Sequence, residues 1–171
     1  MKYIVFSILV LATAGLACSI SVNIPTQPVV VTDTPELTSV TVYFMDTARY
    51  QVGTEPYETA VTRTVPASDS LPLVVLSQMF LGPTPDEAAS GLSLVLSGAT
   101  GFSSFTVDNG VARLFLIGMC NSNGSTYTIA NLVAANLAQF PQIQWIKIYD
   151  ENGQTETPDG QTSSIPLCLE P

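Results

Sequence analysis

The apolar residues between positions 40 and 149 switch between two spacings, and their order limits the folds that this chain can adopt. Val40, Val42 and Phe44 alternate with other residues at every second position, which is typical of a half-buried strand. Residues 129–140 instead place Ile, Leu, Val and Phe three and four positions apart, which is typical of a helix. We therefore expect one domain that mixes strands with helices.

Turn and capping residues divide this part of the chain into six elements. The first helix ends at Gly82-Pro83, and Asn109-Gly110 predicts a tight turn between two strands. A second helix begins after Ser125 or Thr126 and stops at Pro141. The predicted elements are a strand at 40–44, a helix at 71–81, strands at 105–107 and 111–117, a helix at 126–140 and a strand at 144–149.

The order β-α-β-β-α-β folds most simply into an α+β domain with a single sheet and two helices packed on one face. We expect this domain to cover residues 39–154, which is an ordinary length for one domain. Residues 155–171 then form a C-terminal tail.

Several short motifs lie at the ends of these elements. They are Leu81-Gly82-Pro83-Thr84, Gly91-Leu92, Asp108-Asn109-Gly110-Val111-Ala112, the segment 132–141, and Ile146-Lys147-Ile148 followed by Gly153. In order and spacing they resemble the GerMN domain of sporulation and germination proteins. The resemblance implies a β-α-β-β-α-β domain of bacterial envelope lipoproteins and membrane proteins, without known catalytic residues and similar to ring-building domains.

The N-terminus has the pattern of a lipoprotein signal peptide. Lys2 precedes an apolar run, and Leu16-Ala17-Cys18 closes the run as a lipobox does, although Gly15 stands where Leu is commoner. We expect residues 1–17 to be removed and Cys18 to carry the lipid that anchors the chain to the cell membrane. The alternatives are ordinary cleavage after Ala17 or a retained membrane helix, but the run is short for a hydrocarbon core of ~30 Å.

The segment 18–38 is rich in Pro, Thr and Val, which favours an extended stalk between the lipid and the domain. Together these features predict a protein held at the extracytoplasmic face of the membrane. In that oxidising compartment Cys120 and Cys168 are expected to form a disulfide that pins the tail. Two unrelated thiols are the alternative.

Composition excludes several functions. The chain has 5 basic and 14 acidic residues, so clustered cations for a nucleic acid are lacking. It has no histidine, which excludes Ser-His-Asp and Cys-His catalysis and imidazole metal sites. A hydrolase with two carboxylates stays conceivable, but no spacing singles out a pair. We expect neither an enzyme, nor a metal, nor a cofactor.

Two uncharged helical faces are candidate interaction surfaces. The first helix is apolar on nearly every side, so that Leu73, Leu76 and Phe80 would face the sheet while Val75 and Met79 lie elsewhere. The second helix would expose a small, uncharged set. Its members are Ala130, Asn131, Ala134 and Ala138. The alternatives are a connection or the tail covering the first helix, and a general preference of exported proteins for uncharged residues.

Asn136 is a departure from similar domains, which tend to carry Thr there. Helical spacing places its amide among apolar residues, where it must find hydrogen-bond partners. It either bonds to nearby backbone or offers a polar contact to a ligand between helix and sheet.

The leading hypothesis is a non-catalytic domain for protein interaction or self-association in the envelope; the alternative is a small-ligand or cell-wall glycan binding module.

Overall fold

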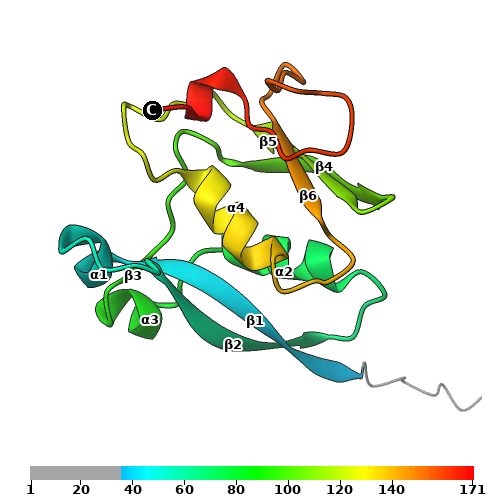
Figure 1. Cartoon of the computed structure of the whole chain (residues 1–171). Helices are drawn as coiled ribbons and strands as arrows, with labels where there is room; N and C mark the ends of the chain where they lie inside the picture. The colour runs from blue at the N-terminus through cyan, green and yellow to red at the C-terminus, as the bar shows by residue number, and fades with distance from the viewer. Residues whose placement is uncertain (1–35) are drawn as a thin grey trace, which may run out of the picture. The chain divides into compact units, whose positions relative to one another are not determined.

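A computed structural model describes residues 36–171; the signal peptide, Cys18 and all but the end of the predicted stalk lie outside these residues. Figure 1 labels the elements along the chain. They are β1 (Leu37–Asp46), α1 (Thr47–Gln51), β2 (Glu58–Pro66), α2 (Leu71–Phe80), α3 (Pro85–Ala89), β3 (Leu92–Ser93), β4 (Gly101–Asp108), β5 (Val111–Ile117), α4 (Ile129–Leu137), β6 (Trp145–Tyr149) and a final 3₁₀ turn at Leu167–Leu169.

The strands form two sheets of three strands each, in the orders β2-β1-β3 and β4-β5-β6. The α+β class is confirmed, but the prediction of a single sheet is wrong. β1 pairs along its length with β2, a strand that was not predicted, while β6 joins β5 in parallel beside the β4–β5 hairpin. No strand of one sheet therefore pairs with a strand of the other.

Both long helices lie between the two sheets, as Figure 1 shows. α2 packs on β1, and its Phe80 ring also lies 5.3 Å from the ring of Phe102 on β4. α4 packs on β1 and β6. The predicted arrangement, with both helices on one face of one sheet, is wrong because a second sheet covers their other side.

The position of α2 explains why it is apolar on nearly every side. Val75 is 1% exposed and Met79 is 0% exposed, so neither belongs to a surface. The prediction that they form an interaction surface is wrong. Leu73, which was expected to face the sheet, is 37% exposed. A helix between two sheets buries two faces and leaves only a narrow side for solvent.

β2 was missed because a charged residue occupies one of its inward positions. Its inner side carries Val61, Arg63 and Val65, opposite the buried side chains of β1. The guanidinium of Arg63 lies 5.5 Å from the centre of the Phe44 ring, which is the geometry of a cation–π contact. Arg63 therefore covers the core with its stem and places its charge at the edge.

The charge of Arg63 is neutralised at the Leu-Gly-Pro-Thr motif and the short helix that follows it. Arg63 Nη2 donates to the carbonyl oxygen of Gly82, 3.1 Å away, and to the carboxylate of Glu87. Thr84 caps α3, because its hydroxyl accepts from Glu87 N and Glu87 accepts from Thr84 N at 2.7 Å. Burial alone raises the pKa of Glu87, but these hydrogen bonds from Thr84 and Arg63 outweigh it and lower the pKa.

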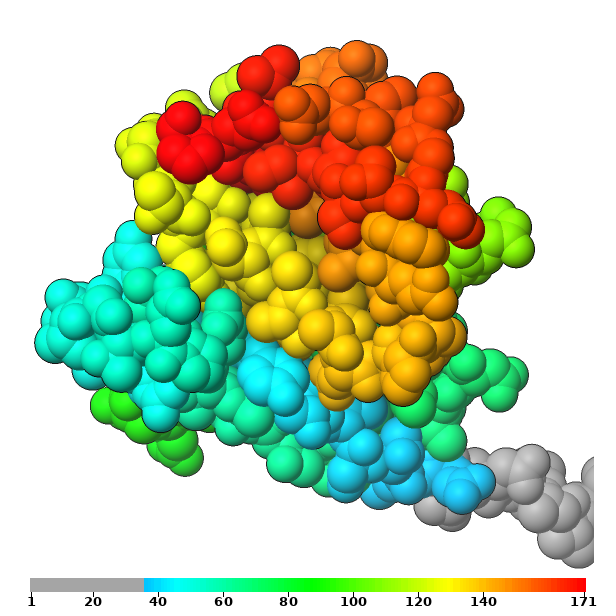
Figure 2. Space-filling view, viewed as in Figure 1, coloured from blue at the N-terminus to red at the C-terminus, as the bar shows by residue number. Residues whose placement is uncertain are grey.

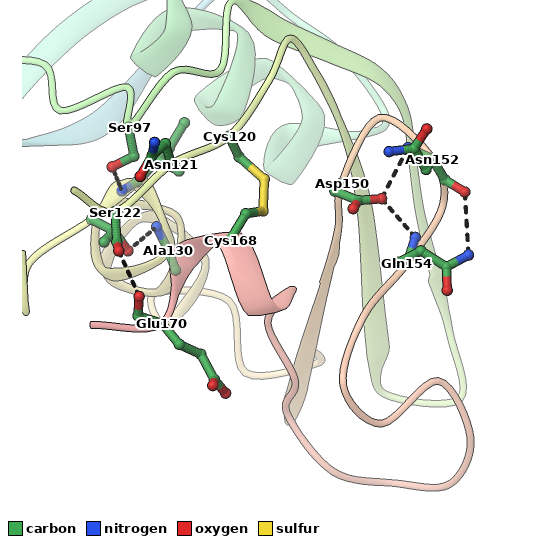
Figure 3. The surroundings of a disulfide bond; sticks show 12 residues. Ser97, Cys120, Asn121, Ser122, Ala130, Asp150, Asn152, Gln154, Cys168 and Glu170 are labelled. Carbon is green, nitrogen blue, oxygen red and sulfur yellow. Dashed lines mark hydrogen bonds between the residues drawn. A yellow bond between two sulfur atoms is a disulfide. The ribbon is translucent and has the colours of Figure 1, made fainter. Parts of the chain in front are cut away.

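The C-terminal tail is part of the fold rather than a loose end. Cys120 and Cys168 form the predicted disulfide, with their Cα atoms 5.6 Å apart (Figure 3). Next to it, Ser122 N donates to Cys168 O at 2.7 Å. Ser164 pairs with the outer edge of β6, since Ile148 N donates to its carbonyl at 2.9 Å. The tail thereby closes an edge that another strand could join.

A buried lysine fixes the rest of the tail. Lys147 on β6 is 0% exposed, and its ammonium donates to the carbonyl oxygens of Thr157 and, at 3.0 Å, Asp159. A buried cation is costly unless polar groups surround it. The loop before Ser164 supplies those groups and is held against β6 in return.

Removing the disulfide is expected to destabilise the domain. The bond spans a sequence separation of 48, and constraining an unfolded loop of that size is worth about 4 kcal/mol in the chain-entropy model. Urea unfolding of the compact unit, residues 34–171, should show this loss for the Cys120→Ser/Cys168→Ser double variant. Each single variant should lose as much, and an unchanged midpoint would show that the disulfide does not stabilise the fold.

Candidate functional site

α4 begins at a cap formed by two side chains. The hydroxyl of Thr128 accepts from Ala130 N at 3.3 Å, and Asn131 Oδ1 accepts from Thr128 N at 2.8 Å. This reciprocal arrangement satisfies backbone donors that a helix start leaves unpaired. The helix therefore begins at Ile129, after the predicted start near residue 126. Its rotation about its axis then decides which side chains reach solvent.

One side of α4 is exposed and uncharged. We call Asn131, Ala134 and Ala138 the α4 strip, because all three are exposed and follow helical spacing. The strip lies in a chain segment, 114–146, that contains no charged residue. Ala130 is buried and does not belong to the strip, which corrects its placement in the predicted surface. In Figure 2, atoms of the α4 region reach the surface between the C-terminal tail and the β1 side of the domain.

Asn136 is fully occupied by the protein's own backbone. It is 0% exposed, its Oδ1 accepts from Tyr43 N and its Nδ2 donates to Tyr43 O, both at 2.9 Å. Nδ2 also donates to Leu132 O at 2.9 Å. The prediction of a polar contact for a ligand is wrong for this residue, because no hydrogen-bonding group is left for one. Gln139, in the turn after α4, adds a bond to Thr41 O at 3.1 Å, so two side-chain amides line one edge of β1.

Replacing Asn136 by Ala is expected to lower the free energy of unfolding by about 3 kcal/mol, because both main-chain groups of Tyr43 lose their partner. Urea unfolding of residues 34–171 measures the loss. Gln142→Ala, which removes an exposed amide after α4, should change stability by less than about 0.5 kcal/mol. Equal stability of the two variants would show that the bonds to Tyr43 do not hold α4 in place.

A pocket of about 400 Å³ opens beside the start of α4. We call it the tyrosine pocket; its lining residues are Glu55, Pro56, Tyr57, Glu58, Thr126, Tyr127 and Asn131. The ring centres of Tyr57 and Tyr127 lie 5.7 Å apart, and each lies within 5.7 Å of the ring centre of Tyr50. Tyr57 packs edge to face on both other rings, and Tyr50 and Tyr127 are tilted at 55°, so the three rings form a packed aromatic wall.

A hydrogen bond joins this wall to a carboxylate. The hydroxyl of Tyr127 donates to Glu58 Oε1 at 2.7 Å, and burial together with this carboxylate raises the pKa of Tyr127. Tyr127 lies in the loop before α4, although the sequence predicted a helix that begins at residue 126. Glu58 and Tyr57 were missed because they belong to β2 and the loop before it. The alternation of Val61, Arg63 and Val65 with Thr62 and Thr64 was the available signal.

The described part of the chain offers no group of side chains that could hold a metal ion. Among residues 36–171, no helix is long and apolar enough to cross a membrane. The geometry defines an α+β domain with one uncharged helical strip and one acidic, aromatic pocket.

The comparisons with known proteins identify the family. The family model for sporulation and spore germination, named Germane, matches residues 41–157, so the chain belongs to this family and the predicted resemblance is confirmed. A solved structure described as the tandem GerMN domains of the sporulation protein GerM from Bacillus subtilis is 16% identical, with a TM-score of 0.48. The match covers 79% of this chain and 48% of that one, so the chain spans about half the length of that structure. No curated protein matches the chain.

Proposed function

We propose that this protein is a lipid-anchored, extracytoplasmic member of its family whose domain binds other envelope proteins or copies of itself and catalyses no reaction. The α4 strip carries the proposal. Ala134 and Ala138 let another surface approach closely, and no charge would be buried in the contact. Asn131 begins the strip, and its Oδ1 is already held by the helix cap.

The proposed location rests on separate observations. Leu16-Ala17-Cys18 has the lipobox pattern, and Cys18 is left over once Cys120 and Cys168 have paired. A structural disulfide is typical of exported proteins and rare in a reducing cytosol. A lipid on Cys18 would hold the domain near the membrane while the segment 18–38 gives it reach.

Contacts of the α4 strip are tested most directly by crosslinking inside the cell. A photoreactive amino acid at position 134 should give a discrete crosslinked band containing this chain and one partner, or two copies of this chain. The matched control is position 89, an exposed alanine on the short helix α3. Equal crosslinking from both positions, or none from position 134, would contradict the proposal.

A charged side chain on the strip is expected to weaken the contact. In this experiment the photoreactive amino acid is placed at position 138 of the strip. Ala134→Glu should then lower the yield of the crosslink to the partner at least about tenfold, because burying an unpaired carboxylate costs more than 1.4 kcal/mol. Ala89→Glu is the control with the same charge change. Both alanines are exposed on helices, so circular dichroism should show that both variants stay folded.

The anchor is tested by lipid labelling. Cys18→Ser should abolish incorporation of labelled palmitate and release the chain from the membrane fraction, because no other residue of the lipobox can form the thioether. Cys168→Ser, which also removes one thiol, should keep the label. Label on the Cys18→Ser chain would show that the lipid is attached elsewhere.

A further inference from the structure

The tyrosine pocket has an uneven charge. Glu55 and Glu58 line it, and no Lys or Arg does. Arg49 contacts one lining residue, because its Nη1 donates to Pro56 O at 3.0 Å, while its Nε lies 3.8 Å from Asp46 Oδ2. Arg49 is thus engaged at the rim. Inside, the two carboxylates would repel an anionic ligand and would be costly to cover with a purely apolar one.

Two polar side chains of the pocket, Glu58 and Asn131, are held by hydrogen bonds before any ligand arrives. Tyr127 is only 6% exposed and fixes one carboxylate oxygen of Glu58. The other oxygen, Oε2, has no hydrogen bond to residues 36–171. Asn131 likewise uses its Oδ1 for the helix cap and leaves Nδ2 without a partner in the described chain. Among the lining residues, Glu58 therefore keeps one acceptor and Asn131 one donor for a ligand.

We propose that the tyrosine pocket binds a small ligand through a protonated primary amine, with Glu58 Oε2 and Glu55 accepting from the ammonium group and the ring of Tyr57 lying against it. An ammonium group is attracted both by carboxylates and by the face of an aromatic ring. Asn131 Nδ2 then donates to a hydroxyl or carbonyl oxygen of the ligand. A volume of about 400 Å³ is within the usual range for small-molecule sites.

This binding is independent of the proposed protein contact. The pocket adjoins the α4 strip only through Asn131, which lines the pocket and begins the strip. Ala134 and Ala138 do not line it, and neither glutamate is on α4. Loss of amine binding would leave crosslinking from position 134 unchanged. Loss of that crosslinking would likewise leave amine binding unchanged.

Titration with three probes tests the proposal on the full chain, purified in a non-ionic detergent under oxidising conditions. The probes are glucosamine, N-acetylglucosamine and Nα-acetyl-lysine amide. Signals of ¹³C-labelled tyrosine rings report binding. Tyr57 and Tyr127 should shift with glucosamine or the lysine derivative, and Tyr149, which stacks on Phe115 at 4.3 Å in the other sheet, should stay fixed. Tighter binding of glucosamine would identify an amino sugar as the small ligand, and tighter binding of the lysine derivative would identify an aliphatic amine.

The neutral probe and two variants decide the outcome. N-acetylglucosamine keeps the sugar ring without the charge and should bind at least about tenfold more weakly than glucosamine. Glu58→Gln keeps an oxygen for the Tyr127 hydroxyl and should weaken amine binding about tenfold, whereas Glu151→Gln, in the exposed turn after β6, should not. Absence of a shift with both amines, equal binding of the neutral sugar, or no effect of Glu58→Gln would each overturn the proposal.

Discussion

The side-chain amide of Asn136 determines how the two halves of the domain fit together. It bonds to both main-chain groups of Tyr43, at a place where a neighbouring strand would otherwise pair with β1. Gln139 extends the same role to Thr41. β3 pairs with β1 at Met45 and Asp46, and α4 covers the neighbouring part of this edge, while β4, β5 and β6 form a sheet of their own. At Tyr43 the helix thus takes the place that a strand would have.

Once the sheets are separate, both long helices become interior elements, and this leaves few surfaces for binding. α2 loses two of its faces to the sheets, which is why Val75 and Met79 are buried despite their position on the helix. α4 keeps only the side opposite its buried residues. A family that uses this domain for contact would therefore have to use the α4 strip, the outer sides of the sheets, or the loops at the ends.

Local chemistry was readable from the sequence, and long-range pairing was not. Asn109-Gly110 forms the predicted turn, with φ angles of 49° and 80°, because Asn and Gly tolerate the positive φ angles that this turn requires. β2 was missed because Arg63 breaks its apolar alternation, and its reason, contacts with Phe44 and Glu87, is visible only in three dimensions. Asn136 was identified as a buried amide in need of partners, but periodicity cannot show which strand edge supplies them. The tyrosine pocket is lined by Glu58 of β2 and by Tyr57 just before it, so it could not be predicted without that strand.

The cap of α4 connects the buried architecture with both proposed binding surfaces. Thr128 and Asn131 fix where the helix begins, and helical spacing places Asn136 on its buried side and Ala134 on its exposed side. Asn131 Oδ1 is bound to the cap, and the residue both begins the α4 strip and lines the tyrosine pocket. A change of Asn131 would disturb the helix start, the strip and the pocket together. Glu58 and Ala134 lie on either side of that border, so they separate the two functions where Asn131 cannot.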